Sequence, residues 1–210
     1  AIDYITRIHQ TDPSKPIFIK YAPGATHAPH HPTKEWVDKI HAMHLFDDGY
    51  EKLRERIFEN QKKLGVVPPD TKLTGRIPKI PAWDSLTDEE KKLYARQMEV
   101  FAAMLTHVDE QMGRIIEGLE RTGQLDNTLI FVTADNGSSG EGGLSGSFNE
   151  TYVLNGLQTP LEANFNNQED WGRENTYPHY HAGWAMAGNT PFRYFKQSEH
   201  RGGQHDALVV

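Results

Sequence analysis

A long amphipathic helix is the feature that most constrains the fold of this chain. Apolar side chains recur at helical spacing over about thirty residues that follow Thr87. Thr87 and Glu90 have the spacing of a capping box, so the helix is predicted to begin here, and Gly123 is placed to end it. A helix with one apolar face packs on a sheet or on another helix. The apolar stripe consists of Leu93, Met98, Phe101, Leu105, Val108, Met112, Ile115 and Leu119.

Two apolar segments flank this helix in the sequence and are predicted to be strands. Residues 16–22 ("PIFIKYA") are rich in β-branched and aromatic side chains. Residues 128–134 ("TLIFVTA") are almost continuously apolar, which is typical of a parallel strand buried on both faces. The order of strand, helices, long helix and strand predicts an α/β fold with a central, largely parallel sheet flanked by helices.

Weaker patterns predict the remaining elements. Ile2, Ile5 and Ile8 indicate a helix at the start of the chain, and the last residues, "DALVV", read as a strand. Because the chain begins within a helix and ends in a strand, we expect it to be an excerpt of a larger protein. Thr33 is placed to cap a short helix, and residues 66–83 are predicted to be an extended connection. A further helix is expected over residues 47–65, with its apolar face made by Tyr50, Leu53, Ile57 and Leu64.

The composition excludes several classes of function. The chain has 210 residues, 37% hydrophobic and 24% charged, which suits one globular domain or a large piece of one. Its net charge of -7 argues against a nucleic-acid partner, and no apolar run is long enough to span a membrane. With no cysteine, this chain has no disulfide, thiolate metal site or cysteine nucleophile of its own. Both a cytoplasmic and a periplasmic or secreted location stay open.

Asp135 and Asn136 end the second predicted strand and are followed by a glycine. Ligands of open parallel sheets gather at the carboxyl ends of the strands. The two side chains offer hard oxygen ligands, but Ca2+ takes six to eight oxygens, so they would supply only part of a metal site. An ordinary Asp-Asn-Gly turn is the alternative, and the residues themselves leave both interpretations open.

Several segments resemble type I sulfatases of the arylsulfatase branch, within the alkaline-phosphatase superfamily. "LDNTLIFVTADNGSSGEGG" resembles the strand and metal loop of these enzymes, "FIKYAPGATHAPHHPTKEW" their histidine loop, and "TPFRYFKQSEHRGGQHDALVV" their lysine segment. The resemblance covers essentially the whole chain in the same order. It implies that residues 1–210 are the central part of a sulfatase catalytic domain with an alkaline-phosphatase-like fold.

The resemblance also implies roles for four residues. Asp135 and Asn136 match two calcium ligands of the family, with Mg2+ the less favoured ion. His27 matches the histidine near the sulfate and the leaving-group oxygen, and Lys196 matches the lysine that binds the sulfate. The implied substrate is a small-molecule sulfate ester. A cation and a lysine at the sulfuryl oxygens would stabilise the developing charge, and a histidine can protonate the leaving oxygen.

One family feature is missing from these residues. Sulfatases use a cysteine in C-x-P-x-R, or a serine in the same frame, that is converted to formylglycine, and neither pattern occurs here. Asn189 in "NTPFR" precedes a Pro-x-Arg tail, but that segment matches another part of the family. The formylglycine, the family's paired acidic calcium ligands and its Lys-x-His segment are expected upstream of Ala1. We therefore expect the 210 residues alone to lack sulfatase turnover.

Residues 138–195 are predicted to be a long active-site loop region, because little of this stretch has helical or strand periodicity. Four aromatic side chains in it either wall a substrate pocket or pack the loop on its own core, and both readings stay open. They are Trp171, Tyr177, Tyr180 and Trp184.

Three functions remain open at this point. The first is hydrolysis of sulfate monoesters, and the second is a phosphate or phosphonate ester hydrolase of the same superfamily. The third is a non-catalytic calcium-binding or interaction module. Asn136, where phosphate-hydrolysing relatives more often have histidine, favours a hard cation and the sulfatase interpretation. The histidine pairs 41/44 and 179/181 are disfavoured as transition-metal sites, because no convincing third ligand accompanies them.

Overall fold

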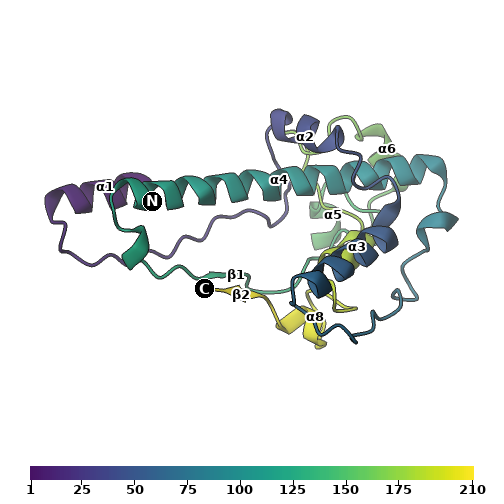
Figure 1. Ribbon diagram of the computed structural model, residues 1–210. Helices are drawn as coiled ribbons and strands as arrows, with labels where there is room; N and C mark the ends of the chain where they lie inside the picture. The colour runs from purple at the N-terminus through teal and green to yellow at the C-terminus, as the bar shows by residue number, and fades with distance from the viewer.

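The computed structural model describes all residues, Ala1–Val210, and is built mainly of helices. Figure 1 shows α4 as a long rod: the other helices gather around its N-terminal half, whereas α1 lies beside its C-terminal half. The elements are α1 (Ile2–Thr11), α2 (Lys34–His41), α3 (Gly49–Lys63), η1 (Trp83–Ser85), α4 (Asp88–Arg121), η2 (Leu125–Asn127), β1 (Val132–Thr133), α5 (Thr151–Leu154), α6 (Leu161–Asn166), α7 (Ala182–Gly188), α8 (Arg201–Gln204) and β2 (Leu208–Val209).

The start of α4 is fixed by the predicted capping box. The Thr87 hydroxyl accepts a hydrogen bond from the Glu90 backbone N–H (3.2 Å), and the Glu90 carboxylate accepts one from the Thr87 N–H (2.8 Å). The first half of the apolar stripe is buried, with Leu93 fully inaccessible. The second half is only partly covered, and Leu105 is 50% exposed. The helix is therefore confirmed, but its apolar face is buried mainly in its N-terminal half, and near its C-terminus only Leu119 of the stripe is buried.

The core is an aromatic cluster between α3, α4 and α7. Tyr50, Trp83 and Trp184 meet edge to face, with ring centroids 5.3–5.5 Å apart. The Trp184 indole N–H donates to the Tyr94 carbonyl at 2.8 Å, so the ring is buried without an unpaired polar atom. Trp171, Tyr180 and Trp184 are each at most 3% exposed. Of the two interpretations of the loop aromatics, these three pack the core, whereas Tyr177 is 39% exposed.

The three helices predicted before α4 are formed, whereas α5, α6 and α7 lie within residues 138–195, which were predicted to be a loop region. α1 buries Ile5, α2 begins after Thr33, and α3 ends just before Gly65, which has φ +73°. The predicted apolar face of α3 is wrong at Leu64, which is 79% exposed. Of the predicted face, Tyr50 is buried and Leu53 and Ile57 are partly buried, and Gly49, Arg54 and Phe58 are buried as well. This helix packs against α7.

The strand predicted over residues 16–22 is not formed. This segment is extended but unpaired, and Phe18 is 91% exposed. A strand is stabilised by hydrogen bonds to a neighbour, and no other segment of the chain supplies them here. The prediction is therefore wrong for this structure, because β propensity without a pairing partner does not make a strand.

The largely parallel sheet is also not formed by residues 1–210. The sheet consists of β1 and β2, paired antiparallel with Val132 opposite Val209 and Thr133 opposite Leu208. Residues 128–134, expected to be buried on both faces, are exposed: Phe131 is 60% and Val132 48% accessible. Burial on two faces requires helices on both sides and a strand at each edge, and β1 has only β2 beside it.

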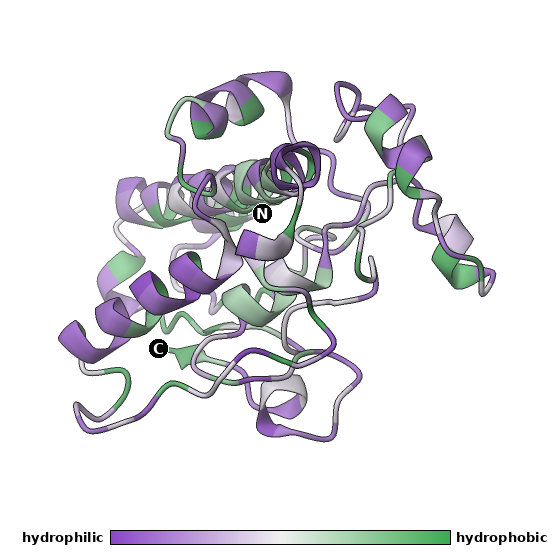
Figure 2. Ribbon diagram, turned by 90° about the vertical axis from the view of Figure 1, so that its right-hand side faces the viewer, coloured by the Kyte–Doolittle hydropathy of each residue, from purple (hydrophilic) through white to green (hydrophobic).

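Hydrophilic residues are distributed along the longer helices as well as hydrophobic ones (Figure 2). No helix combines the length and the apolar character needed to cross a bilayer.

Candidate functional site

The loop that follows β1 is held against two later segments of the chain. The Ser138 N–H donates to the Asn189 side-chain oxygen at 3.0 Å, and the Ser138 carbonyl accepts from the Lys196 N–H at 2.9 Å. The Asn189 amide also donates to the carbonyls of Tyr194 (2.7 Å) and Gly202 (2.6 Å). The side-chain amide of Asn189 therefore connects the loop after β1 with residues 194–202, which gives Asn189 a structural role.

Glycines allow this close approach. A Cβ on Gly137 would lie 1.8 Å from the Gly202 carbonyl oxygen, and one on Gly140 would lie 2.2 Å from the Phe195 ring. Both distances are far below a carbon van der Waals contact, so any side chain would push the loop away from residues 194–202.

His27 and Lys196, which are 169 positions apart in the sequence, meet beside this loop. The Lys196 ammonium nitrogen lies 3.4 Å from His27 Nε2. His27 Nδ1 lies 2.7 Å from the Ala28 carbonyl oxygen. Because a carbonyl can only accept, Nδ1 carries the proton and Nε2 turns its lone pair toward Lys196. The imidazole is on the exposed side of the pair, and the Lys196 side chain is 21% exposed.

Glu141 forms an ion pair with Lys196. One of its carboxylate oxygens accepts from Lys196 Nζ (2.9 Å) and from the Ser139 hydroxyl (2.8 Å), and the other accepts from the Gln197 amide (2.7 Å). Burial alone would raise the pKa of Glu141, but the hydrogen bonds from Lys196 and Ser139 outweigh it and the pKa is lowered. Glu141 is therefore a carboxylate at neutral pH.

A buried histidine lies behind this carboxylate. His179 is 1% exposed, and burial lowers its pKa to about 4, so the ring is neutral at pH 7. Its Nε2 is 2.9 Å from the Ser139 hydroxyl, which itself donates to Glu141. Its Nδ1 lies 3.2 Å from the Tyr180 carbonyl oxygen, so the ring lies between that carbonyl and the Ser139 hydroxyl, which links it to the Glu141 carboxylate.

Glu150 is a second carboxyl group coupled to the same charges. It is 4% exposed, and its Oε2 has no hydrogen-bond partner. Burial raises the pKa of Glu150 and the negative charge of Glu141 adds to the effect, while His27 and Lys196 act in the opposite direction. A buried carboxyl without a partner is least costly when it is protonated.

Asp135 and Asn136 lie at the other end of the loop, next in sequence to the residues that hold Lys196. The Asp135 carboxylate is exposed and forms no hydrogen bond or ion pair with the protein. The Asn136 amide donates to the Gly137 carbonyl at 3.0 Å, which leaves its oxygen free. Burial, and then the charge of Asp135, raise the pKa of Asp206, so a second carboxyl lies near Asp135.

These oxygen donors fit part of a hard-cation site. Two or three oxygens are present where Ca2+ takes six to eight, and no cluster of three or more histidine, aspartate or glutamate side chains that could hold a metal ion is found. The structure thus brings His27 and Lys196 into contact, and it joins Asp135 and Asn136 to them through the backbone of Ser138.

The other histidine pairs contact groups of the protein. His41 Nδ1 lies 3.0 Å from both oxygens of Glu99, and His44 Nδ1 lies 3.0 Å from an Asp47 oxygen. His179 contacts Ser139, whereas His181 caps α7 by accepting from the Gly183 N–H.

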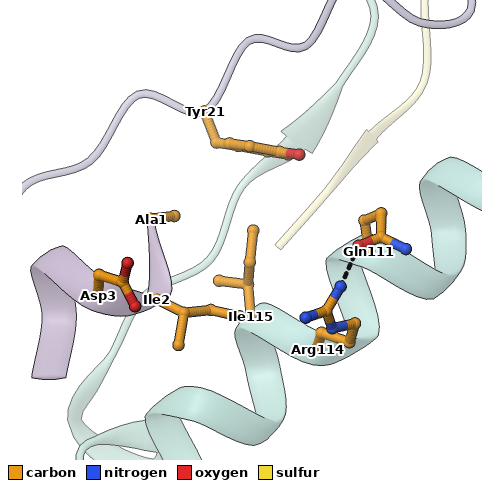
Figure 3. A pocket seen from close by; sticks show the side chains of 7 residues that line it. All are labelled: Ala1, Ile2, Asp3, Tyr21, Gln111, Arg114 and Ile115. Atoms are coloured by element: carbon orange, nitrogen blue, oxygen red, sulfur yellow. Dashed lines mark hydrogen bonds between the residues drawn. The ribbon is translucent and has the colours of Figure 1, made fainter.

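Two hollows lie away from the site. A groove of about 1100 Å³ runs between α2, α4 and residues 168–174, with charges of both signs along it. A smaller hollow of about 290 Å³ lies between α1 and the C-terminal half of α4, and Figure 3 shows Tyr21 above it and the Arg114–Gln111 hydrogen bond at its edge. Neither contains His27, Lys196 or Asp135.

The sulfatase family model matches residues 1–209 of this chain. The chain belongs to the sulfatase family. An uncharacterized sulfatase of Schizosaccharomyces pombe is 34% identical over 203 residues, which are 92% of this chain and 34% of that relative. An arylsulfatase of Klebsiella aerogenes is 30% identical over 204 residues, 97% of this chain and 42% of that relative. An arylsulfatase of Clostridium perfringens is 27% identical over 137 residues, 65% of this chain and 24% of that relative.

Membership of the sulfatase family indicates an alkaline-phosphatase-like α/β fold, although these residues form only the β1–β2 ladder of a sheet. The chain spans 34% and 42% of the first two relatives, so it corresponds to well under half of a sulfatase of their length.

Three residues of this candidate site were not predicted from the sequence. Glu141, Ser139 and Glu150 occur in a stretch rich in glycine, serine and asparagine that carries no periodicity. The one available signal was Glu141 itself, the single charged residue between Asn136 and Asn149.

The unpartnered carboxyl of Glu150 predicts a pH-dependent effect on stability. Because folding raises its pKa, stability falls as the pH rises through the ordinary carboxyl pKa to the raised value, and it stays lower at neutral pH. We expect Glu150→Gln to raise the Tm by on the order of 2–4 °C near pH 7, with the gain absent below about pH 4. Thermal unfolding across this pH range measures it.

Glu174→Gln is the matched control, because Glu174 is exposed and forms no ion pair. It should leave the Tm unchanged at every pH. A Tm near pH 7 that is lower for Glu150→Gln than for the unsubstituted protein would contradict this interpretation of Glu150.

Proposed function

We propose that the protein hydrolyses sulfate monoesters as an arylsulfatase-like enzyme that uses a divalent cation, Ca2+ in preference to Mg2+. The observation that carries this proposal is the 3.4 Å contact of Lys196 Nζ with His27 Nε2. Two relatives that the chain matches are named arylsulfatases. The contact joins two groups that this chemistry requires, from segments that are far apart in the sequence.

Each group has a distinct task in sulfate ester cleavage. Negative charge is spread over the sulfuryl oxygens and builds on the leaving oxygen as the S–O bond breaks. The Lys196 ammonium would bind the sulfuryl oxygens and offset their charge. His27 Nε2, on the exposed side of the pair, would lie at the bridging oxygen. Once Nε2 is protonated, it would deliver that proton to the leaving alcohol or phenol.

Asp135 and Asn136 would hold the cation with oxygens contributed from elsewhere in the protein. When bound, a divalent cation polarises the sulfuryl oxygens as a Lewis acid. The role of the protein residues is to place the cation and the lysine on the same sulfate, and the short Ser138 connection supports that role. Since neither the C-x-P-x-R segment nor its serine form is present, we propose that the 210 residues alone show no turnover.

The proposed function predicts a substrate preference and a metal dependence in the full-length protein that carries these residues. We expect turnover of an aryl sulfate well above that of the matching aryl phosphate, and loss of turnover with a calcium chelator. Initial rates with both esters, with and without chelator, measure this. A preference for aryl phosphate would support a phosphate ester hydrolase instead. Turnover that is insensitive to the chelator would contradict the proposed requirement for a divalent cation.

Asp135→Ala tests the proposed metal ligand by a binding measurement that does not depend on turnover. Loss of a charged oxygen ligand should weaken Ca2+ binding by on the order of 100-fold or more, as measured by titration calorimetry on the full-length protein. Asp126→Ala, at an exposed aspartate before the same strand, is the control and should bind Ca2+ normally. Unchanged affinity in Asp135→Ala would exclude Asp135 as a ligand.

A further inference from the structure

We propose that Glu141 is a positioning residue that holds the Lys196 ammonium beside His27, an inference that rests on the proposed function. The Glu141 carboxylate lies 2.9 Å from Lys196 Nζ. The same Nζ atom lies 3.4 Å from His27 Nε2. Glu141 itself makes no hydrogen bond to His27. Any effect it has on the reaction would therefore pass through the lysine.

The geometry of the lysine gives the first argument. A lysine side chain has a long flexible stem, and ordering it requires contacts at both ends. The Lys196 backbone N–H donates to the Ser138 carbonyl at 2.9 Å, which fixes the start of the side chain. Glu141 fixes its end. Since an ammonium group has three N–H donors, one can bind Glu141 and another can face His27, which leaves one for a sulfuryl oxygen.

The support of Glu141 gives the second argument. Its two oxygens receive hydrogen bonds from Ser139 and Gln197 as well as from Lys196. The backbone on either side of Glu141 is confined. A Cβ on Gly142 would lie 2.1 Å from the Tyr180 carbonyl oxygen, and a Cβ on Gly140 would lie 2.2 Å from the Phe195 ring. A carboxylate held by three donors in a confined loop has a fixed position, as a positioning group requires.

The sign of the charge gives the third argument. A carboxylate near an anion site repels the anion, so Coulomb energy alone disfavours Glu141 beside a bound sulfate. The ion pair is also partly solvated, with side-chain exposures of 21% for Lys196 and 19% for Glu141. Such a pair adds little to stability. Neither anion binding nor stability therefore explains the ion pair. The remaining role for Glu141 is to orient the Lys196 ammonium.

The opposing effects of charge and orientation make the proposal testable by direction. Glu141→Gln removes the negative charge and keeps the size of the side chain. If Glu141 acts only by its charge, the variant should bind inorganic sulfate more tightly. If it positions Lys196, binding should weaken, and kcat/KM for an aryl sulfate should fall by on the order of 10–100-fold. Calorimetry with sodium sulfate and initial rates on the full-length protein measure both quantities.

A double-mutant cycle shows whether the effect passes through the lysine. In a Lys196→Met background, Glu141→Gln should change neither kcat/KM nor sulfate binding further. Glu199→Gln is the matched control, because Glu199 is exposed, lies close to Lys196 in sequence and forms no ion pair. It should behave as the unsubstituted enzyme. Tighter sulfate binding in Glu141→Gln, or additive losses in the cycle, would overturn the proposal.

A labelling measurement separates this proposal from the proposed function. The rate at which an acylating reagent modifies Lys196, followed by mass spectrometry, should rise severalfold in Glu141→Gln and stay unchanged in Glu199→Gln. An unchanged rate in Glu141→Gln overturns the positioning role. If the unsubstituted protein hydrolyses no aryl sulfate, the proposed function fails, while the labelling rate still decides whether Glu141 holds Lys196.

Discussion

The site depends on two hydrogen bonds of the Ser138 backbone. Its N–H is bound by the Asn189 side chain and its carbonyl by the Lys196 N–H, so a residue two positions after Asn136 is tied to the lysine segment. These two hydrogen bonds connect the loop of the predicted metal ligands with the predicted sulfate-binding lysine, and the contacts of Glu141 with Lys196 and Gln197 add to the connection. Gly137 and Gly140 allow this close approach, because a side chain at either position would push the loop away from residues 194–202.

The polar groups around these hydrogen bonds form one connected network rather than a set of pairs. Hydrogen bonds run from His179 through Ser139 to Glu141, and from Glu141 to Lys196, which contacts His27. The inner end is a neutral buried histidine, and the outer end is an exposed imidazole. Such a network keeps the candidate catalytic groups oriented while only the outer groups reach solvent.

Local signals predicted the first four helices, but not α5 to α8. The capping box at Thr87 and the stripe after it specify α4 without reference to the rest of the chain, and Gly65 marks the end of α3 in the same way. The strand predictions held only in part: residues 16–22 form no strand, residues 128–134 form only the short β1, and "DALVV" forms β2. Residues 16–22 and 128–134 have strand composition, but strands depend on neighbours that propensity does not encode, and these segments remain largely exposed.

The candidate site was predictable only in part. His27 and Lys196 were selected by the resemblance to sulfatases, since a lone lysine and a histidine in a proline-rich loop carry no physical signal of their own. Glu141 was missed because its importance lies in what the fold brings to it, namely Ser139, Lys196 and Gln197. A sequence shows a charged residue between glycines but not the ammonium group that will lie against it.

The most direct test of this account is a crystal structure of the full-length protein with Ca2+ and sulfate bound. The account predicts a cation about 2.3–2.6 Å from oxygens of Asp135 and Asn136. It also predicts that one sulfate contacts the cation, Lys196 Nζ and His27 Nε2. A structure in which Asp135 and Asn136 face bulk solvent, away from His27 and Lys196, would contradict it.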